Sequence, residues 1–451
     1  MNKNKSGNYY LFVKKELIMM KHSQKCKIIF SLLISLTLFS YTSSLMIPIN
    51  HNNDVWIKAS SSDKNIYYEK INSVTYQVII NFTLTHKYST TFTSDYYFKF
   101  SRLNDRSPNS TLTPLTPPYQ QSTLLYNKIV GSKYAPQVYH DKFNNTYDIF
   151  NATLAPDESI TYSQKYIITL NELSFNNLNI SKIGTYDTSS YIFDLFCNKT
   201  ETFYERDNAT LIAVSNSIVN PSDNPYLKAK KICNWVSNYL SYDDSLNEEK
   251  GAAWAYAHKR GDCSDYSDLM ITLLRIQGIP ARKVTGFLVS NNPNLAPQVG
   301  ETWNFYTRQI NSKSSYNILG HAWVEYYLPN IGWVASDPLW NDNYDYVSKS
   351  DYLRFAFNIG AWFKLPYPPP KISYSGEFPH PCIVYYEGSE FEYNYNFKVT
   401  VLSTTIPPIE LLILIVIGIS SAVLIGIILI IVLRSKKRRK AIIQPEYNSN
   451  Y

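Results

Sequence analysis

The sequence predicts a strand-rich region, then a region that mixes α-helices with β-strands, and finally a single long apolar helix near the C-terminus. Segments between Val55 and Leu211 have the composition and the partial apolar–polar alternation of β-strands. Two later segments repeat apolar residues at the helical period, and residues 411–433 form one uninterrupted apolar run. A chain of 451 residues has room for two or three domains.

The N-terminal residues have the layout of a secretory signal. Lys21, Lys25 and Lys27 precede the apolar stretch Ile28–Phe39, and small polar residues follow it. A basic segment, an apolar segment and small residues in this order are typical of a signal peptide. We therefore assign residues 1–44 to an n-region and a signal peptide, with an uncleaved signal anchor as the alternative.

Residues 55–215 are expected to form a β-sandwich-like domain. Val74–Leu84, Thr91–Phe100 and Ser159–Leu170 have strand composition, and turn-forming clusters separate strands. The same region contains seven Asn-x-Ser/Thr sequons, which predict an exposed, glycosylated, extracellular module. These asparagines are Asn81, Asn109, Asn144, Asn151, Asn179, Asn198 and Asn208.

A mixed helix–strand domain is expected over residues 224–365. Asn224-Pro225 is a helix-start pattern, and apolar residues then recur at helical spacing up to Leu240. A second helix is predicted to begin with Asp262 as N-cap and Cys263 in the first turn. Gly278, followed by Pro280, marks its end. One apolar face of this helix consists of Tyr266, Leu269, Met270, Leu273 and Leu274.

Cys263 is a candidate nucleophile because of its place at a helix start. The first-turn amides lack partners within the helix, and the dipole puts partial positive charge there. This predicts a thiol with a lowered pKa, and the free amide of Cys263 is a candidate oxyanion donor. The alternative is a buried, structural cysteine.

His321 and Asp337 are predicted to meet at one end of a β-hairpin. Residues 322–328 and 333–335 have strand composition, and Pro329-Asn330-Ile331-Gly332 forms the turn between them. A carboxylate at this place would fix the tautomer of the imidazole, while the other ring nitrogen faces the thiol. Taken singly, each residue has a structural alternative: a hydrogen-bonded core histidine, and a turn-forming aspartate before proline.

Together these motifs resemble the transglutaminase-like superfamily. The segment Gly261 to Phe287 is similar to its nucleophile segment, and residues 321–327 and 332–338 are similar to its histidine and aspartate segments. The resemblance covers about Asn224 to Asp351. It implies a papain-like α+β core with Cys263 as nucleophile, His321 as base and Asp337 as the residue that orients the base.

The likeness is to the microbial branch, which includes peptidases, amidases and deglycosylating relatives. For a side-chain oxyanion donor, Tyr242 and Trp254 are candidates, with core packing as the alternative role of each. No cofactor is expected, and a metal site built from Cys263 and His321 lacks further clustered ligands.

Charge and cysteine usage narrow the class of protein. The net charge is +7, but residues 1–27 carry seven Lys and one Glu, and residues 434–451 carry six Lys or Arg and one Glu; the remainder carries −4. This is not the charge distribution of a nucleic-acid-binding protein.

The chain has five cysteines, which is too few for a disulfide framework. Candidate disulfide pairs are Cys197 with Cys382, or either of these two with Cys233.

The C-terminal part predicts a single membrane span. The 23 apolar residues Leu411–Leu433 are long enough to cross a bilayer, and the basic segment 434–451 should remain cytoplasmic. Residues 371–405, after a proline-rich break, are expected to form a short β-rich membrane-proximal segment.

These expectations lead to one functional hypothesis and one rival. The hypothesis is a membrane-anchored, extracytoplasmic thiol enzyme that acts on amide or peptide bonds of a protein or peptide through a thioester. Hydrolysis is favoured over amine transfer, because the stretch Ser290–Ser315 is polar and suggests an open cleft, with Trp303, Phe305 and Tyr306 as its aromatic wall. The rival is a non-catalytic binding or adhesion ectodomain on the same scaffold.

Overall fold

The computed structural model describes residues 67–87, 92–246, 249–360, 391–407 and 423–435, and the backbone of three short strands between residues 363 and 386. All of these belong to a compact unit that starts at Ile66. The predicted targeting segment, residues 1–44, and residues 411–422 of the predicted membrane helix lie outside the described residues. Among the described residues, no helix is both long enough and apolar enough to cross a membrane.

The N-terminal region is rich in β-sheet, as predicted. A seven-stranded sheet has the order β11-β10-β19-β1-β6-β14, with β3 also pairing with β6. A second sheet has the order β18-β2-β5-β4. The bounds are β1 (Glu69–His86), β2 (Ser94–Ser101), β3 (Gln120–Ile129), β4 (Gln137–His140), β5 (Thr146–Leu154), β6 (Ser159–Ser174), β10 (Thr302–Ile310), β11 (Lys313–Tyr316), β14 (Lys349–Ser350), β18 (Cys382–Tyr386) and β19 (Phe391–Thr404).

The long strand β1 shows why the sheets pack. Its side chains alternate between buried and half-buried positions from Val74 to Leu84, as expected for a strand with one face in the core. Phe82 on that face meets Phe100 of β2 with ring centroids 5.1 Å apart. The three strands predicted from the sequence are confirmed: Val74–Leu84 lies within β1, Thr91–Phe100 overlaps β2, and Ser159–Leu170 lies within β6.

The seven-stranded sheet combines strands from segments far apart in the chain. Strand β19 lies between β1 and β10, with Ile80 opposite Phe397 and Phe397 opposite Phe305. The sheet therefore unites the region before residue 215, part of the predicted 224–365 domain and the predicted 371–405 segment.

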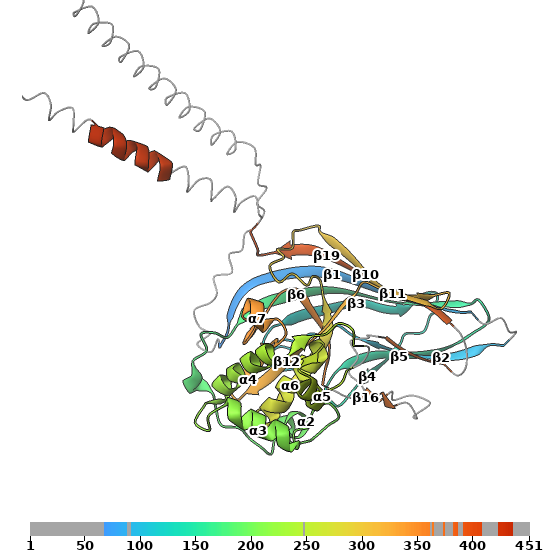
Figure 1. Cartoon of the computed structure of the whole chain (residues 1–451). Helices are drawn as coiled ribbons and strands as arrows, with labels where there is room; N and C mark the ends of the chain where they lie inside the picture. The colour runs from blue at the N-terminus through green and yellow to red at the C-terminus, as the bar shows by residue number, and fades with distance from the viewer. Residues whose placement is uncertain are drawn as a thin grey trace, which may run out of the picture. The chain divides into compact units, whose positions relative to one another are not determined.

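The mixed region contains a four-stranded antiparallel sheet of order β13-β12-β9-β15 and a group of helices. Figure 1 shows helices α2 to α6 gathered near β12 and away from the long strands β1 and β19. The strands are β9 (Ala281–Leu288), β12 (Leu319–Leu328), β13 (Gly332–Ser336) and β15 (Arg354–Ile359). The helices are α2 (Tyr191–Phe196), α3 (Ala209–Ile218), α4 (Pro225–Tyr239), α5 (Ala252–His258), α6 (Cys263–Ile276) and α7 (Asn341–Tyr344).

The four-stranded sheet is buried on both faces. Val324 and Tyr326 of β12 share a core with Leu269 and Leu273 of α6. On the other face, Phe355 meets Tyr76 of β1 with ring centroids 5.2 Å apart. Burial of each such side chain stabilises the fold by about 1.5–3 kcal/mol. The sheet that carries the His321 segment is therefore held between the helices and the seven-stranded sheet.

Gly286 shows how tightly this sheet is packed. It lies opposite His321 in the β9–β12 register. A Cβ atom at this position would lie 1.7 Å from the carbonyl oxygen of Phe355 on β15, so a side chain cannot be accommodated without moving a strand.

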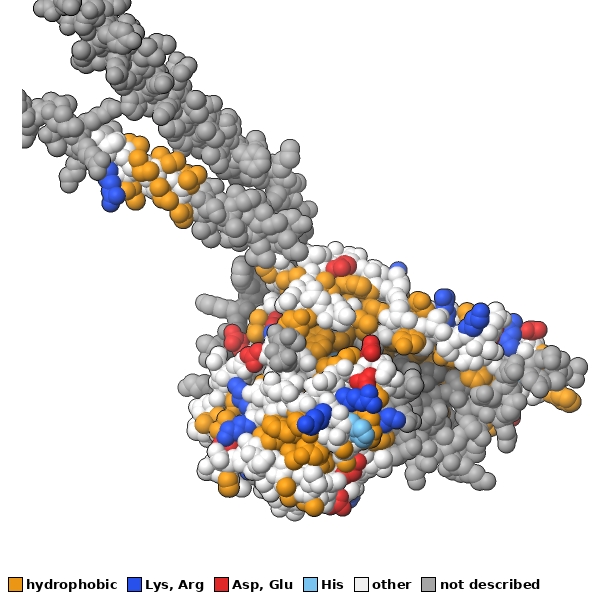
Figure 2. All heavy atoms as spheres, viewed as in Figure 1, with side chains coloured by type: hydrophobic (Ala, Val, Ile, Leu, Met, Phe, Trp, Pro, Cys, Tyr) orange, Lys and Arg blue, Asp and Glu red, His pale blue; other side chains and the backbone are white. Residues whose placement is uncertain are grey.

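On the face of the molecule shown in Figure 2, hydrophobic side chains cluster over the helical region and are bordered by Lys and Arg. Within the helical region, Trp235 and Tyr239 of α4 stack at 4.3 Å and Tyr239 stacks on Tyr256 of α5 at 5.3 Å. The remaining described elements are a helix over residues 423–435 and five short elements, η1 (Ile180–Lys182), β7 (Ser241–Tyr242), β8 (Arg260–Gly261), β16 (Phe363–Lys364) and β17 (Ser373–Tyr374).

Candidate active site

Cys263 is the first residue of α6, as predicted. The Asp262 side chain accepts hydrogen bonds from the backbone N–H groups of Ser264 and Asp265, and the Asp265 carboxylate accepts from the N–H of Asp262. This reciprocal capping box satisfies donors that the first helical turn leaves free. The local sequence thus fixes where the helix begins and where the thiol lies.

His321 and Asp337 meet at one end of the β12–β13 hairpin, which confirms their predicted proximity. Nε2 of His321 lies 2.7 Å from Oδ2 of Asp337, and both side chains are buried. The second carboxylate oxygen accepts from the backbone N–H groups of Leu339 and Trp340. Because each oxygen of Asp337 has fixed partners, the carboxylate can hold the imidazole in one orientation.

Arg354 completes the buried charge network and was not expected from the sequence. Its Nη1 donates to Oδ2 of Asp337 at 2.8 Å, and its Nη2 donates to Asp351 at 2.9 Å. Tyr346 donates to the same Asp351 carboxylate at 2.6 Å. Burial alone would raise the pKa of Asp337, but His321 and Arg354 together hold it well below its usual range. Asp337 is therefore ionised at neutral pH and is an acceptor only, which assigns the hydrogen on His321 to Nε2.

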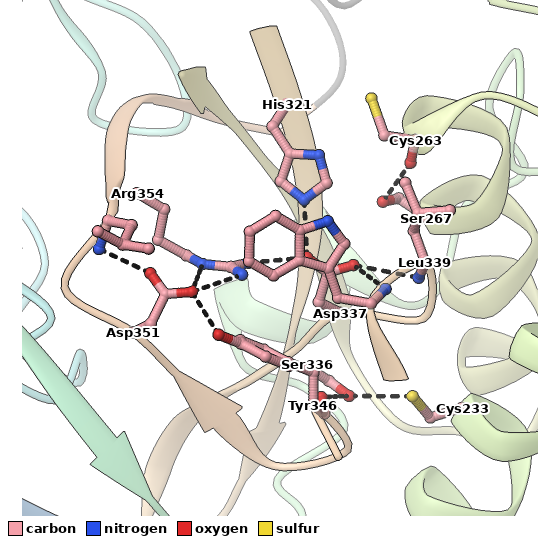
Figure 3. Close-up of polar contacts among 12 residues, drawn as sticks. Cys233, Cys263, Ser267, His321, Ser336, Asp337, Leu339, Tyr346, Asp351 and Arg354 are labelled. Atoms are coloured by element: carbon pink, nitrogen blue, oxygen red, sulfur yellow. Dashed lines mark hydrogen bonds and ion pairs between the residues drawn. The ribbon is translucent and has the colours of Figure 1, made fainter. Parts of the chain in front are cut away.

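The thiol of Cys263 lies beside the histidine segment. In Figure 3 the imidazole stands between Asp337 and Cys263, with one nitrogen directed at Asp337 and the other on the side of Cys263. The sulfur lies close enough to the backbone N–H of Ala322, which directly follows His321, for that N–H to favour the thiolate. Thus three residues from distant parts of the sequence, Cys263, His321 and Asp337, lie in one small region.

The predicted low pKa of the thiol is wrong. Burial and, next, the negative charge of Asp262 raise the pKa of Cys263 to about 12, although the N–H of Ala322 and the charge of Lys283 act in the opposite direction. The helix start was expected to favour a thiolate, but the residue that caps the helix places a carboxylate next to the sulfur. At neutral pH the resting thiol is protonated and needs a base to become a nucleophile.

Lys283 is a buried cation close to this site. Its Nζ lies 2.6 Å from Asp268 of α6 and 2.6 Å from Glu249. The contact with Asp268 joins β9 to α6, and the Lys283 charge partly offsets the effect of Asp262 on Cys263.

Tyr242 lies near the thiol, whereas Trp254 packs against the core that includes α6, the alternative role expected for it. Strand β7 pairs in parallel with β8, which places Tyr242 opposite Gly261, two residues before Cys263. Burial, followed by the charges of Cys263 and Asp262, raises the pKa of Tyr242 to about 12. Trp254 instead stacks on His258 at 4.2 Å. Since 57% of Tyr242 is exposed, core packing does not explain it.

Two further expectations can be compared with the structure. Cys197 and Cys233 are free and buried, so they do not pair with one another, and the side chain of Cys382 lies outside the described residues.

The predicted aromatic wall in the stretch Ser290–Ser315 is not formed as expected. Phe305 is buried in the core that includes β1, and Trp303 packs against that core, because both lie on β10 of the seven-stranded sheet.

Comparison with known proteins agrees with the resemblance seen in the sequence. Residues 212–338 match the model of the Transglutaminase-like superfamily. This match contains α4, α6 and the β12–β13 hairpin, and with them Cys263, His321 and Asp337. The comparison therefore supports a transglutaminase-like domain over residues 212–338.

Curated relatives match over limited lengths. Identity is 25% over 182 residues with the uncharacterized protein YebA of Bacillus subtilis, covering 38% of this chain and 23% of YebA. It is 34% over 84 residues with a protein-glutamine gamma-glutamyltransferase of Pseudomonas aeruginosa, covering 18% of this chain and 10% of the relative. The chain thus spans about a quarter or less of these two proteins.

Solved structures show only a distant likeness. A chain titled "Putative Cysteine Protease" from Cytophaga hutchinsonii is 14% identical with a TM-score of 0.46, covering 76% of this chain and 95% of that one. Red sea bream transglutaminase is 14% identical with a TM-score of 0.23, covering 57% of this chain and 48% of that one.

Proposed function

We propose that this protein is a thiol enzyme that cleaves amide or peptide bonds, with Cys263 as nucleophile, His321 as base and Asp337 as the residue that orients the base. The observation that carries the proposal is the 2.7 Å contact between His321 and Asp337 beside the Cys263 thiol. A nucleophile, a base and an orienting carboxylate in this order are the parts of a catalytic triad.

The first half of the reaction forms a thioester. His321 accepts the thiol proton on its free nitrogen as the sulfur of Cys263 attacks the carbonyl carbon of the substrate. Proton transfer and attack belong together because the resting thiol, with a pKa near 12, is protonated. Asp337 stabilises the imidazolium that forms. The imidazolium then gives its proton to the leaving nitrogen as the C–N bond breaks.

The second half releases the acyl group. A water molecule gives a proton to His321 and attacks the thioester carbonyl, and the C–S bond breaks. The imidazolium returns its proton to the sulfur, which restores the thiol and yields a free carboxylic acid. In the competing reaction an amine takes the place of water and forms a new amide.

Two groups are our candidate donors to the oxyanion of both steps. The backbone N–H of Cys263 is at the helix start, where it has no partner within the helix. The hydroxyl of Tyr242 is on the strand pair next to Cys263. Donors aimed at the developing negative charge lower the barrier.

We favour hydrolysis over amine transfer because the resemblance is to the microbial branch of the family. The Pseudomonas aeruginosa relative, which is named a transferase, makes amine transfer the alternative. The test is a glutamine-containing peptide supplied with excess primary amine, with products analysed by mass spectrometry. A free acid or a cleaved peptide as main product supports hydrolysis, whereas a dominant amine adduct contradicts it.

We also propose an extracytoplasmic site on a single-pass membrane protein. The apolar run 411–433 followed by the basic segment 434–451, the predicted signal peptide and the seven sequons support this topology. Protease added to intact cells should digest the glycosylated ectodomain and spare a tag placed after Tyr451. Loss of the tag, with the ectodomain preserved, would reverse the orientation.

A non-catalytic binding or adhesion ectodomain remains the second candidate. One observation favours it: the raised pKa of Cys263 is what an inert, buried thiol would show. The two candidates differ in one measurable property, because only the enzyme forms a covalent acyl adduct on Cys263 that depends on His321.

A further inference from the structure

A cavity of about 380 Å³ lies apart from the candidate active site. It is formed by residues 112–116, residues 142–144, helix α2 and parts of β9 and β13. None of Cys263, His321 and Asp337 lines it. Its volume is in the range of cavities that hold small molecules, which often lie between structural units.

The guanidinium of Arg282 lines this cavity and keeps one donor group free. Its Nε and Nη2 donate to Glu325 at 2.9 and 2.7 Å, and Nη2 also reaches Thr116 at 3.2 Å. Within the described part of the chain, Nη1 is the one nitrogen of the Arg282 guanidinium that has no hydrogen-bond acceptor. Arg282 is only 5% exposed, so Nη1 depends on the cavity for a partner.

The buried charges around Arg282 do not balance. Arg106 donates to the other oxygen of Glu325 at 2.6 Å, so two buried guanidinium groups share one buried carboxylate. Burial, with Arg106 acting in the same direction, lowers the pKa of Arg282 to about 10 despite the contact with Glu325. An uncompensated buried cation is costly, and an anion in the adjoining cavity would reduce that cost.

The walls beside Arg282 are aromatic. The ring of Trp333 lies 3.8 Å from the guanidinium carbon, and Phe196 meets Trp333 at 5.1 Å and Phe143 at 5.6 Å. Lys142 lies at the rim with half of its side chain exposed, and its Nζ is 3.9 Å from Glu201, a carboxylate that also pairs with Arg275. Asp194, an acidic residue of the lining, is paired with Lys199 at 2.8 Å. The lining therefore offers a cation next to flat apolar surfaces.

We propose that this cavity binds a small molecule with one carboxylate and a flat, apolar body. Nη1 of Arg282 donates to the carboxylate, and Phe143, Phe196 and Trp333 contact the body. This site is separate from the thiol and does not rest on the proposed enzymatic function.

The test compares two probes of nearly equal shape, phenylacetate and its neutral analogue phenylacetamide. Equilibrium dialysis is carried out on the full chain with Cys263→Ala, which removes any covalent reaction. The amide oxygen of phenylacetamide can still accept a hydrogen bond from Nη1 but carries no negative charge, so phenylacetate should bind several-fold more tightly. Equal binding of the two probes, or no saturable binding of phenylacetate up to about 20 mM, would overturn the proposal.

Three variants locate the binding. Leu195, on α2, lines the cavity, so Leu195→Trp adds bulk to it while leaving Arg282 in the sequence, and it should abolish phenylacetate binding. Lys142→Gln should weaken binding a few-fold, whereas Lys128→Gln should not; both lysines lie over a neighbouring aromatic ring, at 4.7 and 5.0 Å, but only Lys142 lines the cavity. Unchanged binding by Leu195→Trp, with an unchanged melting temperature, would place the probe elsewhere and contradict the proposal.

Discussion

Arg354 and His321 share one oxygen atom of Asp337. Nη1 of Arg354 and Nε2 of His321 lie 2.8 and 2.7 Å from Oδ2. The guanidinium also donates to Asp351, so Arg354 balances the charge of two buried carboxylates. It also orients Asp337, the carboxylate that contacts His321. We infer that Arg354 is a positioning residue, which acts on the reaction through Asp337.

Replacement of Arg354 by methionine should destabilise the protein strongly. It leaves Asp337 and Asp351 buried without their shared cation, and breaking a buried ion pair costs about 3–5 kcal/mol. Denaturant unfolding of the full chain measures this loss. Arg308→Met is the matched control, because Arg308 lies over the Tyr306 ring at 4.5 Å on an exposed strand position and should change stability by less than about 0.5 kcal/mol. A small effect of Arg354→Met would contradict the assigned role.

Acid should weaken the fold through Asp337. Its folded-state pKa lies well below the ordinary value near 3.9, because His321 and Arg354 outweigh the effect of burial. The stability that ionised Asp337 provides is thus complete above about pH 4 and is lost as the pH falls toward its folded pKa.

Denaturant unfolding between pH 3 and pH 6 checks this dependence. Below pH 4, the free energy of unfolding should fall less steeply with pH in Asp337→Asn than in wild type. The two slopes should differ by up to about 1.4 kcal/mol per pH unit. Asp157→Asn should keep the wild-type slope, since the Asp157 side chain is 79% exposed. Equal slopes in wild type and Asp337→Asn would mean that Asp337 is not ionised as described.

Asp262→Asn should make Cys263 more reactive. Asparagine can still cap α6, but it removes the negative charge that raises the pKa of the thiol. Alkylation of Cys263 by iodoacetamide at pH 8 should therefore be a few-fold faster in Asp262→Asn than in wild type. In wild type, the alkylation rate should keep rising well above pH 8. The exposed Asp187→Asn serves as control. A wild-type rate that is already maximal at pH 6 would show a thiolate and would contradict the raised pKa.

Tyr242→Phe should lower turnover without affecting folding. The variant loses only the hydroxyl, and loss of one oxyanion donor typically costs about 100-fold or more in kcat. Tyr316→Phe removes a hydroxyl from another exposed tyrosine, 75% exposed on β11, and should leave kcat unchanged. If both variants had the same kcat, Tyr242 would not be an oxyanion donor.

The features that follow from local sequence were predicted well. The Asp262 cap, the start of α6 at Cys263 and the hairpin that joins His321 to Asp337 depend on residues a few positions apart. Strand alternation likewise identified β1 and β6.

The features that depend on tertiary contacts were not predicted. No motif marks Arg354, which reaches Asp337 only because β15 pairs with β9. The pairing of β19 with β1 joins residues more than 300 positions apart, which no local pattern encodes. The pKa of Cys263 depends on burial, so helix position alone gave the wrong direction.

The central claim is that Cys263, His321 and Asp337 act as one unit on an amide carbonyl. The direct measurement is mass spectrometry of the full chain after brief incubation with an amide peptide substrate and acid quenching, with turnover followed in parallel. We expect an acyl adduct on Cys263 in wild type and no adduct in Cys263→Ala, His321→Ala or Asp337→Ala. We also expect double variants that lose little more activity than single ones. A Cys263→Ala protein that turns over the substrate at the wild-type rate would contradict the account.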